Sequence, residues 1–282
     1  MAEPLTLMAV HAHPDDEASG GGILASYSDQ GIQTIVVTCT NGEYGDAPGG
    51  IKPRQPGHDP EVVARLRLEE LEKSASILKV SDVETLGYHD SGMEEWDYKS
   101  QPDAFSNVPL ETVAGRIGEL ITKYRPQVLV TYDDAGAYQH PDHVHASRAA
   151  QAAAAATGIP AKVYLSTMKG SNWRKIFDAL RAAGEDVPSW DNDDSPEARE
   201  RWQRGLESEA RITTTIDIRP VLERKRAALF AHGSQINDSW FSKIPPEVAE
   251  QAFGYEYFIR KTDTTGAPLP EDDLFAGLRR GA

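Results

Sequence analysis

Five ionisable side chains lie within seven residues near the start of the chain, between His11 and Glu17. They follow a short apolar run over residues 5–10, which predicts a strand that is buried on both faces. Polar groups at the end of a buried strand cost free energy unless they bind a ligand or an ion. The stretch therefore indicates a binding or catalytic site close to the N-terminus.

The order His-Pro-Asp-Asp at residues 13–16 indicates which chemistry such a site would perform. Proline is well tolerated in the first turn of a helix, so we expect a helix to begin at Pro14. His13 and Asp16 would then lie three residues apart across the helix start and converge on one point. Imidazole and carboxylate ligands favour zinc or another first-row metal ion. Asp15 would stay available to act as a base.

A second copy of the pattern stands at residues 140–143, His-Pro-Asp-His, again between an apolar run and a helical stretch. Two strand–loop–helix junctions of one design can meet at one edge of a sheet. The alternative is that each motif is only a helix N-terminus, where the macrodipole favours acidic residues. That alternative does not explain why five of the eight histidines lie in or beside the two motifs: His11, His13, His140, His143 and His145. A metal site is the favoured interpretation, and spacing alone leaves its ligands open.

Strands and helices alternate along the first 166 residues. Strands are expected at residues 5–10, 33–39, 83–87, 127–131 and 162–166, with helical patterns between them. This alternation predicts an α/β fold: a Rossmann-like, mainly parallel sheet with helices on both faces. In such sheets ligands bind beyond the carboxyl ends of the strands. The unusually polar loops follow strands here, at residues 11–17, 40–46, 88–93 and 132–143.

The second half of the chain departs from this alternation. We expect residues 1–166 to form the Rossmann-like catalytic core. Residues 167–282 are expected to form a lobe that covers the site, together with strands near 212–216 and 255–259 that return to the core sheet. The whole chain would then be one structural domain, a size that 282 residues allow.

Composition excludes several classes of function. The net charge of −15 argues against nucleic-acid binding, and no run of about 18 apolar residues predicts a membrane span. The short apolar run at the N-terminus lacks a basic region before it and does not resemble a signal peptide. Cys39 is the single cysteine, so no internal disulfide can form, which fits a reducing compartment. A cytoplasmic protein is expected, and a homo-oligomer is compatible with these features.

The residues in the two motifs fit metal-assisted hydrolysis of an amide or ester. A zinc ion with three protein ligands and one open position lowers the pKa of a bound water. Asp15 could accept the proton of that water, while His140 and Tyr138 could face the oxyanion of a tetrahedral intermediate. Asp142 could hold the ring of His140 in one orientation. Two other classes stay open: a non-catalytic, metal-dependent glycan-binding module, and a phosphoesterase, which usually needs two metal ions.

These motifs resemble those of the LmbE-like (PIG-L) de-N-acetylases, zinc hydrolases that remove acetyl groups from N-acetylglucosamine units. The resemblance lies in AHPDDE at residues 12–17 and GAYQHPDH at residues 136–143. DSGM at residues 90–93 and AHGSQ at residues 231–235 are most similar to the mycothiol enzymes, the N-acetylglucosaminyl-inositol deacetylase and the mycothiol S-conjugate amidase. The ending LPEDDLFAG at residues 269–277 looks especially like the amidase. The family fold is Rossmann-like, in agreement with the pattern of strands and helices.

The resemblance implies a role for each of nine residues. They are the zinc ligands His13, Asp16 and His143, the catalytic residues Asp15, His140, Tyr138 and Asp142, and the sugar or inositol contacts Arg67 and Asp90. Asp15 would be the general base, with Asp142 behind His140. Fe²⁺ is the alternative to Zn²⁺.

The implied substrate is a small N-acetylglucosamine-containing molecule, with the mycothiol precursor as the leading candidate. An S-conjugate amidase or a deacetylase of a glycosylated natural product is the alternative. Residues 168–211 resemble neither mycothiol enzyme, and specificity is expected to be built there.

Overall fold

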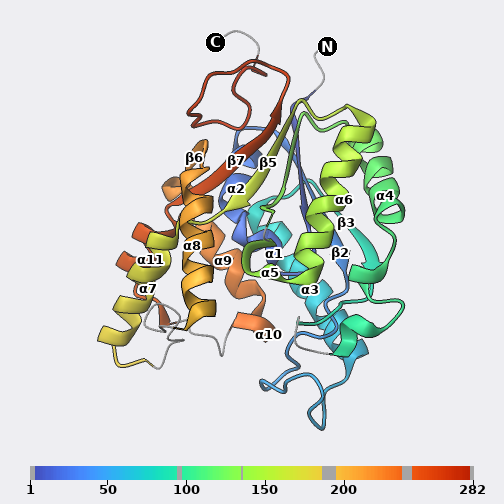
Figure 1. The fold of residues 1–282 in the computed structure, drawn as a ribbon, viewed down its shortest axis with the longest axis vertical. Helices are drawn as coiled ribbons and strands as arrows, with labels where there is room; N and C mark the ends of the chain where they lie inside the picture. The colour runs from blue at the N-terminus through green and yellow to red at the C-terminus, as the bar shows by residue number, and fades with distance from the viewer. Residues whose placement is uncertain (1–3, 94–96, 135, 186–194, 237–242, 280–282) are drawn as a thin grey trace.

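The structure is a computed structural model that describes residues 4–93, 97–134, 136–185, 195–236 and 243–279. One seven-stranded sheet runs through these residues in the order β3-β2-β1-β4-β5-β7-β6. Helices cover both faces of the sheet (Figure 1). The α/β, Rossmann-like class predicted from the sequence is confirmed.

The five strands predicted in the first half of the chain form the parallel part of the sheet. They are β1 (Thr6–His11), β2 (Gln33–Thr40), β3 (Asp82–Tyr88), β4 (Val128–Tyr132) and β5 (Lys162–Thr167). All residues of β1 and β4 are buried, as expected for central strands covered on both faces. The chain then returns with β7 (Tyr255–Asp263), which is antiparallel to β5, and with β6 (Thr214–Asp217), which is antiparallel to β7.

Two groups of helices bury the two faces of the sheet. One face packs against α2 (Gly21–Asp29), the C-terminal end of α3 (Pro60–Leu78) and α9 (Leu222–Ala231), which follows the short helix η3 (Arg219–Val221). The other face packs against α4 (Leu110–Tyr124) and α6 (Pro141–Thr157), with the short helices η1 (Asp97–Ser100) and η2 (Phe105–Asn107) before them. Among the described residues, no helix is both long enough and apolar enough to span a membrane.

A smaller apolar cluster lies at one flank of the sheet. It joins α7 (Gly170–Ala182) to α11 (Pro246–Phe253), and α8 (Pro196–Ala210) lies beside α7 (Figure 1). Two arginines of this part reach the loop after β4: Arg204 donates to Gln139 Oε1 at 3.2 Å, and Arg211 lies 3.0 Å from Asp134. The C-terminal half is therefore tied both to the edge of the sheet and to the loop that carries the second motif.

The first motif does not begin its helix where the sequence analysis placed it. Helix α1 (Asp16–Ser19) begins at Asp16 rather than Pro14, because Asp15 has φ = 146°, a value that no helix allows. The carboxylate of Asp16 turns back and accepts the backbone N–H of His13 at 2.8 Å. In the second motif the helix does begin at the proline, since Pro141 is the first residue of α6.

A buried ion pair lies at the edge of the sheet where the parallel strands begin, opposite the edge that carries the two motifs. Lys162 at the start of β5 is fully buried, and its Nζ lies 2.5 Å from Glu271 Oε1 in the LPEDDLFAG segment. The same carboxylate accepts hydrogen bonds from Tyr164 Oη at 2.8 Å and Thr214 Oγ1 at 3.0 Å. Burial opposes ionisation of Glu271, but the hydrogen bonds from Lys162 and Tyr164 hold its pKa below the ordinary value.

We expect Glu271→Gln to lower the free energy of unfolding at pH 7 by about 3 kcal/mol, because the charge of Lys162 would be left buried without its counter-ion. A carboxylate whose pKa is lowered in the folded protein stabilises the fold at pH values above the ordinary carboxyl pKa of about 4.3. This stabilisation is lost as the pH falls below that value toward the pKa of the folded protein. Urea unfolding from pH 7 to pH 3.5 measures both effects. Glu223→Gln, at an 85% exposed side chain, is the control. Equal stability of the two variants would contradict the prediction.

Candidate metal centre and active site

The two His-Pro-Asp motifs meet because their strands are neighbours. Strands β1 and β4 are parallel, with Leu7 opposite Val128 and Ala9 opposite Val130. Their carboxyl ends therefore lie at the same edge of the sheet, where the loop after each strand carries one motif. The polar loops after β2 and β3 reach the same edge, because those strands continue the parallel order.

The three predicted metal ligands come together from the two motifs. His13 Nδ1 lies 3.2 Å from His143 Nε2 and 3.3 Å from Asp16 Oδ2, and His143 Nε2 lies 3.4 Å from Asp16 Oδ1. Ligand atoms at zinc–ligand distances of about 2.0–2.1 Å in a tetrahedron stand about 3.3 Å apart. The three side chains thus fit one metal ion. His140 is the alternative third ligand, because its ring nitrogen lies within 4.8 Å of those of His13 and His143.

The other nitrogen of His13 faces two carboxylates. His13 Nε2 lies 3.2 Å from Asp142 Oδ2 and 3.6 Å from Asp90 Oδ1. Burial opposes protonation of His13, but Asp90, Asp142 and Asp16 together hold its pKa well above the ordinary value. Side-chain atoms of His13, Asp90 and Asp142, one from each, also lie within 4.8 Å of one another, as the ligands of a metal ion do. They are better explained as a carboxylate pair that orients a ligating ring through its second nitrogen.

The position of Asp142 corrects an expectation from the sequence. Its carboxylate was expected behind His140, and in the structure it lies behind His13 and accepts the backbone N–H of Ser91 at 2.9 Å. Asp142 reaches His140 with its backbone N–H, which donates to His140 Nδ1 at 3.2 Å. The reason is its place as the second residue of α6, where the N–H points back to the capping residue and the side chain points across the site.

Asp15 has the properties that a general base needs. Burial raises its pKa to about 6, although the charge of Arg67 lowers it, and its side chain keeps 27% of its surface exposed. A carboxyl group with a pKa near neutrality accepts and returns protons most effectively. Its backbone, at φ = 146°, is strained, and its N–H donates to Glu17 Oε2 at 3.0 Å.

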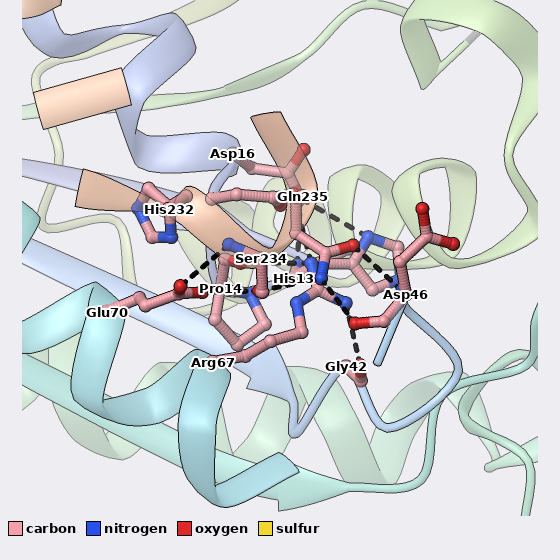
Figure 2. A network of polar contacts seen from close by, with 12 residues as sticks. His13, Pro14, Asp16, Gly42, Asp46, Arg67, Glu70, His232, Ser234 and Gln235 are labelled. Carbon is pink, nitrogen blue, oxygen red and sulfur yellow. Dashed lines mark hydrogen bonds and ion pairs between the residues drawn. The ribbon is translucent and has the colours of Figure 1, made fainter. Parts of the chain in front are cut away.

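Arg67 holds the first motif in place through hydrogen bonds to the backbone. From α3, and only 4% exposed, it donates to the carbonyl oxygens of Gly42 at 2.7 Å and Pro14 at 2.9 Å (Figure 2). Its Nη2 also lies 3.0 Å from Asp15 Oδ2. These contacts give Arg67 a positioning role that the sequence did not indicate, and the predicted contact with substrate stays a prediction.

Three more residues were predicted to belong to the site, and the structure describes the side chains of two of them, Asp90 and His140. Asp90 is 5% exposed and accepts the N–H of Gly92 at 2.7 Å; burial opposes its ionisation, but His13 holds its pKa below the ordinary value. Burial and the nearby His13 lower the pKa of His140 to about 2, so at neutral pH this ring is neutral and carries its proton on Nε2, since Nδ1 accepts a hydrogen bond. Tyr138 lies in α5 (Gly136–Gln139), and its side chain lies outside the described part of the structure.

Two groups at the site were missed from the sequence. The hydroxyl of Tyr132 donates to Asp16 Oδ2 at 2.7 Å and accepts the N–H of Ala12 at 2.7 Å, and its ring stacks on that of His143 at 4.2 Å. Glu17, fully buried, binds His232 Nε2 at 2.6 Å, and His232 belongs to the distant AHGSQ segment at residues 231–235. The signal for Tyr132 was its place at the end of a buried strand directly before a motif loop.

Comparison with known proteins identifies the family of this chain. The family model described as PIG-L, GlcNAc-PI de-N-acetylase, matches residues 8–154, which contain both motifs. The chain belongs to the PIG-L family. A relative from Acidothermus cellulolyticus, 1D-myo-inositol 2-acetamido-2-deoxy-alpha-D-glucopyranoside deacetylase, is 37% identical over 97% of this chain and 95% of its own length. The mycothiol S-conjugate amidase of Streptomyces coelicolor is 34% identical over the full length of both chains.

A solved structure shows that this PIG-L chain has the fold of a known deacetylase. The N,N'-diacetylchitobiose deacetylase from Pyrococcus horikoshii superposes with a TM-score of 0.61 over 92% of this chain and 84% of its own, at 18% identity. At this identity the likeness concerns the fold, and the substrate has to be argued from the site.

We expect Tyr132→Phe to weaken the binding of Zn²⁺ to metal-stripped protein by about tenfold or more, because Asp16 loses the hydroxyl that orients it. Isothermal titration calorimetry measures the affinity. Tyr88→Phe is the matched control, because the buried Tyr88 hydroxyl has no hydrogen-bond partner among the described residues. Equal affinities for the two variants would show that the hydroxyl does not position the ligand.

Proposed function

We propose that this protein is a zinc-dependent hydrolase that removes the N-acetyl group from a small molecule containing N-acetylglucosamine. One observation carries the proposal: the ring nitrogens of His13 and His143 lie 3.2 Å apart, and each lies within 3.4 Å of a carboxylate oxygen of Asp16. Asp15, directly before Asp16, is a carboxyl whose burial raises its pKa to about 6. The relative named as a deacetylase of an inositol-linked acetamido sugar supports N-acetylglucosaminyl-inositol, the mycothiol precursor, as the leading substrate.

His13, Asp16 and His143 would hold the metal ion. The donor set of two imidazoles and one carboxylate suits Zn²⁺, with Fe²⁺ as the alternative. When bound, the ion supplies an acidified water and polarises the acyl carbonyl. Asp142 and Asp90 keep the ring of His13 oriented through its second nitrogen.

The chain's own residues move the protons of the reaction. Hydrolysis breaks the amide C–N bond and adds a hydroxyl to the acyl carbon and a proton to the amine. Asp15 takes the proton from water and returns it to the departing amine. His140, neutral and protonated on Nε2, donates to the acyl oxygen as negative charge develops there, with Tyr138 assigned to the same place.

The sugar and its partner group lie between the core and the lobe in this proposal. Residues 1–166 form the catalytic core, and residues 167–282 form the lobe that covers the site together with the returning strands. The contacts of Arg204 with Gln139 and of Arg211 with Asp134 support this arrangement, because they join α8 and the residue directly after it to the loop that carries Tyr138. Arg67 and Asp90 are assigned to the sugar or its inositol partner. The single cysteine, buried at Cys39, fits action in the cytoplasm, and a homo-oligomer is compatible with the fold.

An S-conjugate amidase is the second candidate, since a relative of that name matches the full chain. The ending LPEDDLFAG gives it no extra support. Glu271, Leu274 and Phe275 of this segment are buried, and Glu271 binds Lys162 at the edge of the sheet opposite the site. The contacts of this segment therefore stabilise the fold and lie away from the proposed metal ligands.

Metal-stripped protein given one equivalent of Zn²⁺ is expected to release acetate from N-acetylglucosaminyl-inositol, and protein without metal is not. Acetate is measured by a coupled enzymatic assay, with bound zinc confirmed by elemental analysis. Zinc-loaded protein that releases no acetate would exclude this substrate, and the S-conjugate of mycothiol is the next compound to test.

Asp15→Asn is expected to lower kcat by at least about 100-fold, because the proton acceptor is lost while the ligand atoms stay in place. Zinc affinity, measured in parallel, should change by less than about tenfold. A non-catalytic glycan-binding module would instead bind the sugar equally well with and without the Asp15 carboxylate and would release no acetate in either form.

A further inference from the structure

Each of the three polar side chains in the AHGSQ segment, residues 231–235, binds a different part of the protein. His232 Nε2 lies 2.6 Å from Glu17 Oε1, beside the first metal motif. Ser234, in α10 (Gly233–Ile236), gives Glu70 two hydrogen bonds, from its N–H at 2.8 Å and from its hydroxyl at 2.6 Å. Gln235 reaches the loop after β2 at Asp46 (Figure 2). The mechanism above leaves this third contact without a role.

Gln235 binds the backbone of Asp46 in both directions. The N–H of Asp46 donates to Gln235 Oε1 at 3.1 Å, and Gln235 Nε2 donates to the carbonyl oxygen of Asp46 at 3.1 Å. The two residues are 189 positions apart in the chain. A primary amide has one acceptor and one donor side by side, so it can pair with a backbone unit as a neighbouring strand would. Two bonds fix the orientation of the loop as well as its position.

The loop of residues 41–46 has a second anchor at Arg67. Its Nη1 donates to the carbonyl oxygen of Gly42 at 2.7 Å, and the same guanidinium lies 3.0 Å from Asp15. A Cβ at Gly42 would lie 2.4 Å from Arg67 Nη1, and a Cβ at Gly45 would lie 2.7 Å from Gln235 Oε1. The loop is thus packed against both anchors, and one of them also holds the proposed general base.

We propose that Gln235 is a positioning residue that holds the 41–46 loop against Arg67. The loop, held in this way, forms one wall of the substrate site. This proposal rests on the proposed hydrolase function and extends it to the C-terminal part of the chain. Gln235 touches none of the ligand or base residues in the contacts described above. Its loss should therefore loosen the wall and weaken substrate binding more than it slows the chemical step.

Gln235→Met tests this role, because methionine keeps the length of the side chain and removes both the acceptor and the donor of the amide. We expect KM for N-acetylglucosaminyl-inositol to rise by about tenfold and kcat to change by less than about threefold. Zinc affinity should equal that of the wild type. Gln235→Glu keeps the acceptor for the Asp46 N–H and loses the donor, so its KM should lie between those of the wild type and Gln235→Met.

A second measurement reports on the loop without using activity. Arg54 is exposed in the segment that continues the loop, and the Lys52–Pro53 bond resists trypsin, so cleavage after Arg54 reports how firmly this segment is held. The rate of this cleavage, followed by mass spectrometry, should rise several-fold in Gln235→Met. The matched control is Gln203→Met on α8, where an exposed glutamine bonds Glu207 at 3.1 Å and no change is expected.

The outcomes separate this proposal from the proposed function. Faster cleavage and a raised KM in Gln235→Met, with partial recovery in Gln235→Glu, support the positioning role. Cleavage as slow as in Gln203→Met overturns it, as does a fall in kcat with KM unchanged. If the wild type releases no acetate, the hydrolase proposal fails, and the rates of cleavage still decide whether Gln235 holds the loop.

Discussion

The structure depends on a group of carboxylates and imidazoles that are buried together at the carboxyl edge of a parallel sheet. Asp16, Asp90 and Asp142 all lie within 3.6 Å of the ring of His13. Burying several carboxylates side by side is unfavourable unless positive charge is buried with them. Arg67 supplies one such charge beside Asp15, and the tetrahedral spacing of the ligand atoms provides a place for a metal ion to supply more. A metal ion at this place would therefore both balance the buried negative charge and supply the chemistry of the proposed reaction.

The backbone of the first motif is part of this arrangement. Asp15 lies directly before Asp16, a proposed metal ligand, and two residues before the fully buried Glu17, and its φ of 146° would not persist without support. Glu17 accepts its N–H, and Arg67 binds both its carboxylate and the carbonyl oxygen of Pro14. Strain at this residue directs Asp15 and Asp16 apart, so that one carboxylate joins the ligand cluster and the other stays partly open to solvent. Two adjacent acids thereby come to lie in different surroundings.

The C-terminal half supports the two edges of the sheet in different ways. At the amino-terminal edge, Glu271 neutralises the buried Lys162 and closes the core. At the carboxyl edge, the segment 232–235 binds the first motif, α3 and the loop after β2. The likeness to a chitobiose deacetylase at 18% identity shows that the fold tolerates wide changes in sequence. Specificity among such proteins has to come from side chains on the loops around the site, because the fold itself is shared.

The sequence by itself determined the strands, the sheet class, the two motifs and the family, because these follow from local hydrophobic periodicity and from residue types at short spacing. It did not determine where helix α1 begins or which ring the Asp142 carboxylate faces, since both depend on the backbone angle of Asp15 and on the register of neighbouring strands. Only the tertiary structure brought Tyr132 to Asp16 across 116 positions, and His232 to Glu17 across 215. Contacts of that range arise from how the strands are ordered in the sheet and how the helices pack on it, and a local pattern holds no record of either.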